Sequence, residues 1–445
     1  MKKIMLFVLA ICLCFTAAGA ALAETAVTEK PAAEMTAEEL YKAGKDAFNT
    51  GDYGKAMEYY QLAADLGNAE GLRSIGYLYQ WGLGVEQNFD KAQEYYQQAA
   101  DQGDTKSLIN IGSIYANGFG VEQDYAKAAE YYQKAADLGE ATGLADLGTM
   151  YLNGHGVEQD YGKALEYYQK AADLGNATAI LNLGYLYDRG AGVEQSYDKA
   201  LEYYQLAADM GHPGGMVNIG TMYVNGLGVE QDYGKAFEYY QKAADLGHAD
   251  AMGSIGYLYA HGLGVEQDYG KALEYYQKAA DLGSVWVLCN IGLLYDKGNG
   301  VEQDLSKALE YYQKGADLGD AMSINNLGYL YERGAGVEQD YAKAMECYQQ
   351  AADMGEPFAY AGIGDLYRQG LGVEQDYAKA VEYYTLAAEQ GEPAGLFGLG
   401  DCCYEGQDLD KAAEYYRKAL EAGYEPDEKE QAHLKEVLGD GYQQK

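Results

Sequence analysis

The hydrophobic positions between residues 104 and 139 form two consecutive helical stripes. In the first stripe, Leu108, Ile111 and Tyr115 follow one another at spacings of three and four residues, the period of one face of an α-helix. A glycine-rich stretch then interrupts the pattern. A second stripe of tyrosine and alanine covers about residues 125–138, with lysine and glutamate on the opposite side. The segment therefore predicts two short helices joined by a loop.

Single residues beside these stripes predict how the two helices begin, end and touch. Asp124 precedes the second helix, where its carboxylate can accept hydrogen bonds from the unpaired first-turn N–H groups. Gly139 follows the same helix and can end it in the left-handed conformation. Gly112 lies at the edge of the first stripe and costs a helix about 1 kcal/mol relative to alanine. We expect close packing of a neighbouring helix to compensate for that cost.

This two-helix unit returns every 36 residues. Its Gly-Val dipeptide begins at residues 84, 120, 156, 192, 228, 264, 300, 336 and 372. Two short helices are marginal alone, because nucleation is costly and each has one uncovered apolar face. Stacked copies cover one another and build a continuous core. The repetition predicts an all-α solenoid of about 11 helix-turn-helix repeats with a capping helix at its C-terminal end.

The ends of the chain differ from the 36-residue unit, which gives an expected division into segments. The two terminal repeats lack the long Gly-Val loop, and a polar helix follows the last of them. The predicted segments are a signal peptide (1–23), a flexible leader (24–38), a terminal repeat (39–67), nine 36-residue repeats (68–391), a second terminal repeat (392–423), and a capping helix with a tail (424–445).

The first residues have the order of a secretory signal. Lys2 and Lys3 precede an apolar run over residues 4–15, and Ala21 and Ala23 provide an A-x-A cleavage site. We therefore expect a periplasmic or secreted protein. No other apolar run approaches the roughly 20 residues that span a bilayer, so we expect no membrane insertion of the mature chain.

The charge of the chain excludes one class of partner. The sequence holds 32 basic and 69 acidic residues, a formal net charge of -37. Such a surface repels phosphates, so nucleic acid and anionic membrane surfaces are not expected partners. The same charge favours solubility and opposes self-association, and we expect a monomer.

No residue pattern predicts catalysis, a metal site or a cofactor. The five histidines form no HxH or HxxxH spacing, and the acidic residues of the "GVEQD" loops do not alternate as calcium ligands do. The glycine-rich loop lacks the Lys-Ser/Thr ending of a phosphate-binding loop. The cysteines beyond the signal do not recur with the period, which indicates core substitutions and leaves disulfide formation open. They are Cys289, Cys347, Cys402 and Cys403.

The assembled pattern A-x-x-x-L-G-x-x-Y-x-x-G-x-G-V-x-x-D-Y-x-K-A-x-x-Y-Y-x-K-A-A-x-x-G resembles the Sel-one-like repeat family over about residues 39–423. The two terminal units are similar to the related tetratricopeptide repeat, with Gly44 and Ala56 in one and Gly400 and Ala412 in the other. The resemblance implies a right-handed superhelix of helix pairs, a concave side lined by the first helix of each pair, and a role as scaffold or adaptor.

Comparison of the copies separates what the fold requires from what it permits. Counted from the residue after each closing glycine, positions 3, 7, 10 and 14 of the first helix vary and fall on one side. Their asparagines and tyrosines suit hydrogen bonding to an extended peptide and stacking on its side chains. The predicted partner-binding residues of the concave face are Asn182, Tyr185, Arg189, Asn218, Ser254, Tyr257, His261, Trp286, Asn290, Lys297, Met322, Asn326, Tyr329, Arg333 and Phe358.

Drift at exposed sites would also produce variation, but it should leave mostly small or charged residues. Trp286, Met322 and Phe358, at position 3 of successive repeats, favour a contact surface instead. The sequence thus predicts a non-enzymatic exported scaffold that binds a protein or peptide. A carbohydrate- or peptidoglycan-binding module is the alternative. A weak β-lactamase-like hydrolase is a further alternative, suggested by cysteine-rich members of the family, whose repeated cysteines are missing here.

Overall fold

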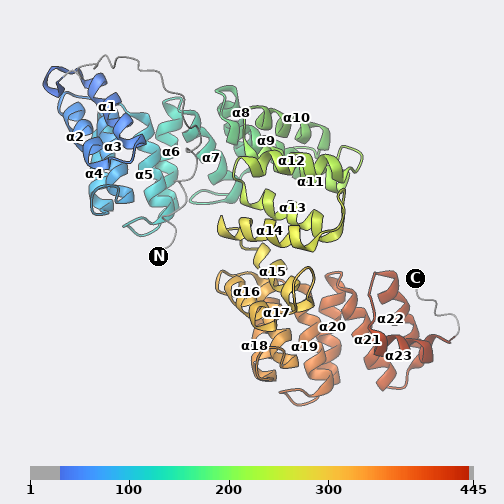
Figure 1. The fold of residues 1–445 in the computed structure, drawn as a ribbon. Helices are drawn as coiled ribbons and strands as arrows, with labels where there is room; N and C mark the ends of the chain where they lie inside the picture. Colours follow the sequence, from blue (N-terminus) through green and yellow to red (C-terminus); the bar gives the residue numbers. More distant parts are fainter. Residues whose placement is uncertain (1–30, 440–445) are drawn as a thin grey trace, which may run out of the picture. The chain divides into compact units, whose positions relative to one another are not determined.

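A computed structural model describes residues 31–439, apart from the side chain of Glu428. Over these residues the chain forms 23 α-helices and one short 3-10 turn (Ala32–Glu34), with no β-strand (Figure 1). The predicted all-α solenoid of helix-turn-helix repeats is confirmed. The predicted signal peptide and part of the predicted leader lie outside the described residues.

Eleven helix pairs follow one another along the chain, and a single helix, α23 (Glu428–Leu438), comes after the last pair. The first helices of the pairs are α1 (Ala37–Asn49), α3 (Ala69–Trp81), α5 (Thr105–Asn117), α7 (Ala141–Asn153), α9 (Ala177–Arg189), α11 (Pro213–Asn225), α13 (Ala249–His261), α15 (Val287–Lys297), α17 (Ala321–Arg333), α19 (Pro357–Gln369) and α21 (Pro393–Glu405). The second helices are α2 (Tyr53–Asp65), α4 (Phe89–Asp101), α6 (Tyr125–Asp137), α8 (Tyr161–Asp173), α10 (Tyr197–Asp209), α12 (Tyr233–Asp245), α14 (Tyr269–Asp281), α16 (Leu305–Asp317), α18 (Tyr341–Asp353), α20 (Tyr377–Glu389) and α22 (Leu409–Glu421).

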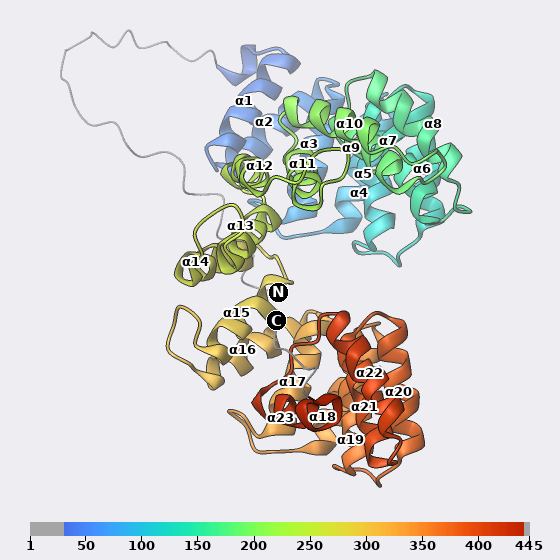
Figure 2. The ribbon, with the colours of Figure 1, turned by 90° about the vertical axis from the view of Figure 1, so that its right-hand side faces the viewer.

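The described residues divide into two compact units. Unit 1 comprises residues 31–143 and 155–157, and unit 2 comprises residues 144–154 and 158–439. Within each unit, a first helix packs against its own second helix and against the second helix of the preceding pair, as the pairs α3–α4 and α2–α3 do in unit 1 (Figure 2). Neighbouring hairpins therefore cover one another's apolar faces, as the sequence predicts.

Caps and glycines end the helices where the pattern places them. Asp124 accepts a hydrogen bond from the backbone N–H of Lys127 at 2.9 Å, which confirms its predicted role. In the preceding loop, Gly118 and Gly120 have φ angles of 66° and 71°, in the left-handed region that favours glycine. The 36-residue unit thus repeats its loop geometry together with its sequence.

A glycine of the first helix and a tyrosine of the second helix fix the spacing inside each hairpin. A Cβ added to Gly112 would stand 2.6 Å from Cε1 of Tyr132, whose ring is buried. The same contact joins Gly184 to Tyr204. The close approach predicted at Gly112 is therefore present, and the tyrosine ring is the group that occupies the space.

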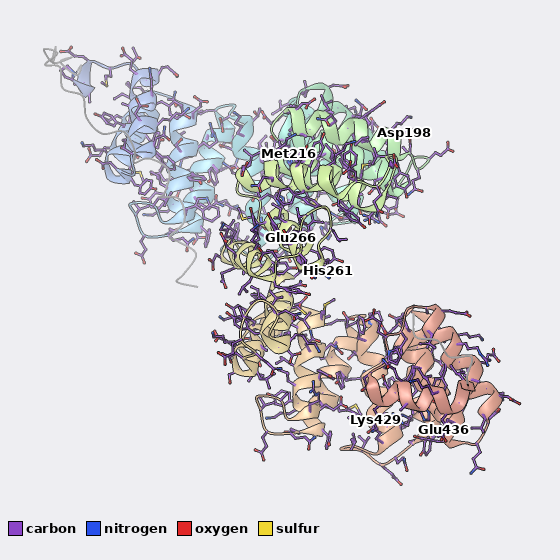
Figure 3. The ribbon with its side chains drawn as sticks, turned by 45° about the vertical axis from the view of Figure 1, so that its right-hand side comes forward. Asp198, Met216, His261, Glu266, Lys429 and Glu436 are labelled. Carbon is purple, nitrogen blue, oxygen red and sulfur yellow. The ribbon has the colours of Figure 1, made fainter. Side chains whose placement is uncertain are left out.

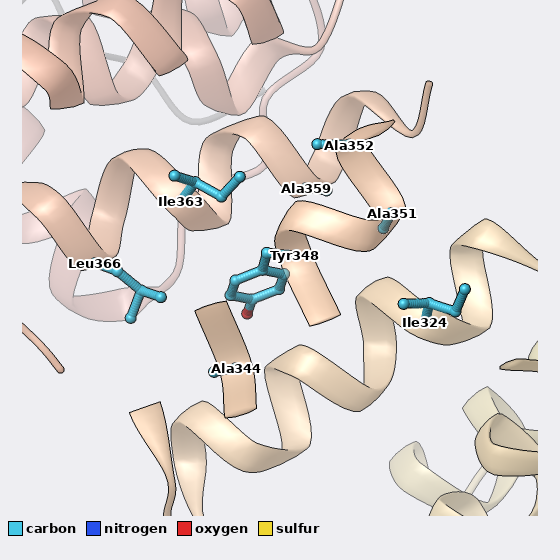
Figure 4. Close-up of a cluster of buried hydrophobic side chains, with 8 residues drawn as sticks. All are labelled: Ile324, Ala344, Tyr348, Ala351, Ala352, Ala359, Ile363 and Leu366. Atoms are coloured by element: carbon cyan, nitrogen blue, oxygen red, sulfur yellow. The ribbon is translucent and has the colours of Figure 1, made fainter. Parts of the chain in front are cut away.

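The core of one repeat interface shows how these rings join adjacent hairpins. Figure 4 shows Tyr348 of α18 among Ile324 of α17 and Ile363 and Leu366 of α19, all of them buried. Full burial of an isoleucine or leucine contributes about 1.5–3 kcal/mol. Ala351 adds a small buried side chain on the same helix as the tyrosine. Each interface between hairpins is thus a small hydrophobic core.

Exposed tyrosines form a second, outer series of contacts. The rings of Tyr187 and Tyr203 stack with centroids 5.6 Å apart, and the ammonium of Lys199 lies 4.8 Å from the Tyr187 centroid. A lysine over an aromatic face is a cation–π contact, about 0.5–1 kcal/mol at an exposed site. Most repeats carry this lysine and this tyrosine pair, which is why the sequence repeats them.

The cysteines and the helix lengths agree with the predictions made for them. Cys289 is buried, and the four cysteines of the described residues carry no disulfide. Burial raises the pKa of the Cys289 thiol to about 12, with Asp320 nearby adding to the effect. Within residues 31–439 no helix has the length and apolar character that a bilayer crossing requires. The same part of the chain groups no three side chains that could hold a metal ion.

Candidate partner-binding surface

The first-helix surface, defined as the fifteen residues predicted to bind a partner, is accessible to solvent. Its ten exposed members are Tyr185, Arg189, Tyr257, His261, Trp286, Lys297, Met322, Tyr329, Arg333 and Phe358. Its five half-buried members are Asn182, Asn218, Ser254, Asn290 and Asn326. None belongs to the core, so these residues are available for contact. All of them lie in unit 2.

Three tyrosines of this surface stand 72 residues apart, on every second repeat, and each has a partner one helical turn later. The pairs are Tyr185 with Arg189, Tyr257 with His261, and Tyr329 with Arg333. The guanidinium carbon of Arg333 lies 5.0 Å from the Tyr329 ring centroid, and its Nη1 donates to the Tyr329 hydroxyl at 3.1 Å. Figure 3 shows His261 at the end of α13. Each pair presents an aromatic ring beside a hydrogen-bonding nitrogen head.

The polar members of the surface also bind within the chain. The amide nitrogen of Asn326 donates to Sγ of Cys289 at 3.1 Å, and that of Asn290 donates to the carbonyl of Trp286 at 3.2 Å. The Ser254 hydroxyl donates to the carbonyl of Asp250 at 2.9 Å. A ligand would therefore compete with, or bind beside, these internal bonds.

Trp286 lies elsewhere than predicted. The sequence places it inside a first helix, but α15 begins one residue later, at Val287, and is shorter than the other first helices. The indole N–H donates to Oδ1 of Asp250 at 3.2 Å, and a Cβ added to Gly253 would meet the ring at 2.5 Å. The ring also meets Tyr276 edge-on, with centroids 6.2 Å apart. The prediction that Trp286 occupies position 3 of a regular helix is wrong, because the space over Gly253 and the Asp250 acceptor hold the indole against α13.

Trp286 nevertheless remains part of the surface. Its exposed fraction is 36%, and it stands beside the exposed Tyr257 on the same pair of helices. The Ser284 hydroxyl donates to the same Asp250 oxygen at 2.7 Å. The turn that displaces the indole is therefore anchored at one carboxylate.

A cavity of about 280 Å³ opens on the first helices of unit 1, where the sequence placed no partner-binding residue. Its lining residues are Tyr41, Lys45, Phe48 and Asn49 of α1, Tyr60 of α2, Arg73, Ser74 and Tyr77 of α3, and Asn110 of α5. Ser74, Tyr77 and Asn110 stand at variable positions 7 and 10, so the copy comparison reaches them. The α1 residues lie in a terminal repeat without the 36-residue register, and the comparison therefore misses them.

The walls of this cavity combine aromatic rings with two cations. Phe48 and Tyr77 meet edge-on with centroids 5.9 Å apart, and the Lys45 ammonium lies 5.7 Å from the Tyr41 ring centroid. Arg73 is committed elsewhere, since its Nε bonds Asp104 Oδ2 at 3.0 Å. Burial raises the pKa of the Tyr60 hydroxyl at the same site to about 12, which keeps it a neutral hydrogen-bonding group. The cavity can receive one side chain of a ligand.

Comparison with protein-family models identifies the repeat. The Sel1 repeat model matches ten segments: residues 31–68, 69–104, 105–140, 141–176, 177–212, 213–248, 249–284, 288–320, 321–356 and 357–392. The chain belongs to the Sel1 repeat family. A tetratricopeptide repeat model matches residues 393–423. The first Sel1 match covers the N-terminal repeat, for which the sequence analysis expects a tetratricopeptide-like unit. Residues 285–287, between two matches, are the turn that carries Trp286.

Solved structures of similar proteins support the assignment of the Sel1 fold. The crystal structure of c5321, a protective antigen present in uropathogenic Escherichia coli strains and displaying an SLR fold, is 31% identical with a TM-score of 0.54 and covers 90% of each chain. A Sel1 repeat protein from Oxalobacter formigenes is 35% identical with a TM-score of 0.51, over 55% of this chain and 99% of that one. A search of curated proteins gives no significant match. A Sel1 repeat solenoid is an architecture consistent with a protein-binding scaffold.

Proposed function

We propose that this Sel1 repeat protein is a non-enzymatic, exported scaffold that binds a protein or peptide partner on the first-helix surface. One observation carries the proposal. Large apolar side chains on the first-helix side of four consecutive hairpins are 36–51% exposed, while the tyrosines that pack between the helices are buried. These exposed side chains are Tyr257, Trp286, Met322, Tyr329 and Phe358. A series of exposed rings is costly in water and is typical of a contact surface.

The chemistry of the surface favours a peptide ligand. Tyrosine supplies a large contact area with few rotatable bonds, and the arginine beside Tyr329 adds a planar hydrogen-bond donor. The half-buried asparagines can bond the amide groups of an extended chain. Because the surface crosses several repeats, we propose that the partner runs along it rather than filling one pocket.

The proposed location of this binding is the periplasm or the exterior of the cell. The support is the sequence of residues 1–23, in which two lysines, an apolar run and an A-x-A site follow one another. The charge of -37 further favours a protein partner over nucleic acid.

A capture experiment tests the proposal. The purified protein is crosslinked to an extract of its native cells, and recovered proteins are compared between the wild type and the triple variant Tyr257→Ala, Tyr329→Ala, Phe358→Ala. We expect the variant to lose its main partner. The matched control is Leu174→Ala with Leu246→Ala, because these leucines are exposed by 57% and 54% but stand at the ends of second helices.

Three outcomes count against the proposal. Unchanged capture by the triple variant would reject the first-helix surface as the binding site. Equal loss in the leucine control would show that any exposed apolar residue contributes, so the surface would not be specific. Retention of purified glycan strands in place of proteins would favour the carbohydrate-binding alternative.

A further inference from the structure

The second helices of unit 2 carry a hollow of about 590 Å³ that belongs to no part of the first-helix surface. It lies between α10 and α12, with residues of α11 contributing to its lining. The lining residues are Leu201, Glu202, Gln205, Leu206, Asp209, Ile219, Tyr223 and Tyr239. Inside it, the Tyr239 hydroxyl donates to Oε1 of Gln205 at 3.1 Å, and the Gln205 amide donates to Asp209 at 2.8 Å. The hollow therefore has leucine and tyrosine walls and a carboxylate rim.

The other repeats show what normally stands at the position of Leu206. Residues at multiples of 36 from it are lysines in five repeats, and each lysine lies over the tyrosine three residues before it. The distances from ammonium to ring centroid are 4.6 Å for Lys134, 5.5 Å for Lys170, 4.6 Å for Lys242, 5.1 Å for Lys278 and 4.9 Å for Lys314. Three of these lysines also bond the glutamate four residues before them at 2.7 Å.

The lysine is missing on α10, but its two partners are still there. Glu202 stands where Glu166 and Glu274 bind their lysines, and Tyr203 stands where the ring receives the ammonium. Within residues 31–439, Glu202 makes no ion pair, and no cation lies over the Tyr203 ring. Leu206 is shorter and uncharged, and 47% of it is exposed at the edge of the hollow. One repeat thus keeps a cation-binding pair of groups without the cation.

We infer that this hollow binds a lysine or arginine side chain from a basic segment of a partner protein. The aliphatic stem lies against Leu201 and Leu206, and the charged head takes the place of the missing lysine, on the Glu202 carboxylate and the Tyr203 ring. Long basic side chains bury their stems on apolar surface in this way. The charge of the whole protein, -37, complements a basic partner and attracts it.

This site goes beyond the function proposed above, because it uses the opposite helices and names the chemistry of the partner. It does not require that the first-helix surface bind anything. A basic segment bound here would give the scaffold a second point of attachment, on helices that the copy comparison otherwise identifies as regular.

The test restores the missing lysine. Fluorescein-labelled hexalysine is titrated with the full described chain by fluorescence anisotropy at low salt. In Leu206→Lys, the protein supplies its own cation, and we expect affinity for hexalysine to fall about tenfold, as the loss of a desolvated cation contact of about 1.4 kcal/mol would cause. Glu202→Gln should weaken binding in the same direction. Folding should be unaffected, because five repeats already carry lysine at this position.

The matched control is Leu386→Lys, which makes the same change of charge at the same register of α20. We expect its affinity for hexalysine to stay within twofold of the wild type. Equal weakening by both lysine variants would show that only the total charge matters, and an unchanged affinity in Leu206→Lys would equally overturn the site. The variant Tyr257→Ala with Tyr329→Ala should bind hexalysine normally, which separates this inference from the function proposed for the first-helix surface.

Discussion

The ring of Tyr276 lies against the α-carbon of Gly256, and a Cβ added to that glycine would stand 2.8 Å from Cδ1 of the ring. The backbone carbonyl of Ala272 would be 3.1 Å away on the same side. The glycine therefore permits α13 and α14 to approach until the tyrosine is fully buried between them. The loss of helix propensity at the glycine, about 1 kcal/mol, is offset by the burial of one aromatic side chain.

Gly256→Ala should consequently destabilise unit 2. The added methyl group meets a buried ring and a backbone carbonyl, neither of which can move without opening the hairpin. Overpacking of this kind costs about 1–3 kcal/mol, more than the better helix propensity of alanine returns. The measurement is the free energy of unfolding in urea, followed by circular dichroism.

Gly270→Ala is the matched control in the same hairpin. A Cβ there would meet only the Oδ1 of Asp268, at 3.3 Å. Ala126 occupies the same register in another repeat, where the capping aspartate still bonds the backbone N–H of Lys127 at 2.9 Å. We expect a change within about 0.5 kcal/mol, in either direction. A comparable loss of stability in both variants would contradict the role given to the ring of Tyr276.

The repetition explains why most of the fold can be predicted from the sequence. Gly112, Tyr132 and Asp124 recur with constant spacing, and a feature that recurs must satisfy the same packing in every copy. The exposure of Tyr257 and Tyr329 follows from the same comparison, because these positions vary. The sequence therefore predicts both the stacking of hairpins and the accessible side of the first helices.

Features that occur once could not be predicted in this way. The turn at Trp286 depends on the coincidence of Gly253 and Asp250 in the preceding repeat, which no periodic pattern records. The cavity of unit 1 depends on Lys45 and its neighbours in a terminal repeat. Such sites arise from contacts between residues that each look like ordinary variation when they are read along the chain.

Arg368 is another residue whose role appears only in the structure, and its removal should be costly. Only 16% of its side chain is exposed; its guanidinium lies 3.3 Å from Asp401 and 2.9 Å from Glu405, and its Nε donates to the Tyr384 hydroxyl at 3.0 Å. Arg368→Met leaves these carboxylates without their cation. We expect a loss of about 3 kcal/mol in the free energy of unfolding at pH 7, measured in urea.

The pH dependence of this loss distinguishes charge from packing. Burial raises the pKa of Asp401, and Arg368 opposes that rise. Without Arg368 the pKa of Asp401 should rise further, so the carboxyl group becomes neutral at mildly acidic pH. The destabilisation should therefore be smaller at pH 4.5 than at pH 7. Arg417→Met, which removes an exposed arginine, is the control and should change stability little at either pH. A pH-independent loss in Arg368→Met would indicate lost packing alone.

The helix caps of two adjacent repeats predict a weakening at acidic pH. His212 caps α11 by accepting from the N–H of Gly214 at 3.2 Å, and His248 caps α13 by accepting from the N–H of Ala251 at 3.4 Å. A protonated ring cannot accept these bonds. Burial lowers the pKa of His212, and His248 lowers it further, so the folded state favours neutral His212. Its contribution is present above the unfolded pKa of about 6.5 and is lost as the pH falls through the lower folded pKa.

Replacement of the cap removes this dependence. In His212→Asn, the side chain can accept as Asn176 does from Ala179 at 2.9 Å, and it carries no proton in this range. Loss of one cap costs about 1 kcal/mol, so the variant should gain about that much relative to the wild type between pH 7.5 and pH 5. His261→Asn, which changes an exposed histidine that caps no helix start, should follow the wild type. Parallel stability curves for the wild type and His212→Asn would contradict this role.

The anchor of Trp286 predicts a spectroscopic change, because the sequence holds only two tryptophans. Asp250 accepts from both the indole N–H and the Ser284 hydroxyl, so Asp250→Ala should release the ring from α13. In a Trp81→Phe background, we expect the emission of Trp286 to shift to longer wavelength as the indole gains water. Gly253→Ala should produce the same shift by a different route, since its new Cβ occupies the place of the ring. Asp250→Asn is the control: its amide oxygen still accepts from the indole, and its emission should stay near that of the parent. An unshifted spectrum in both Asp250→Ala and Gly253→Ala would show that the indole is held by its edge contact with Tyr276 instead.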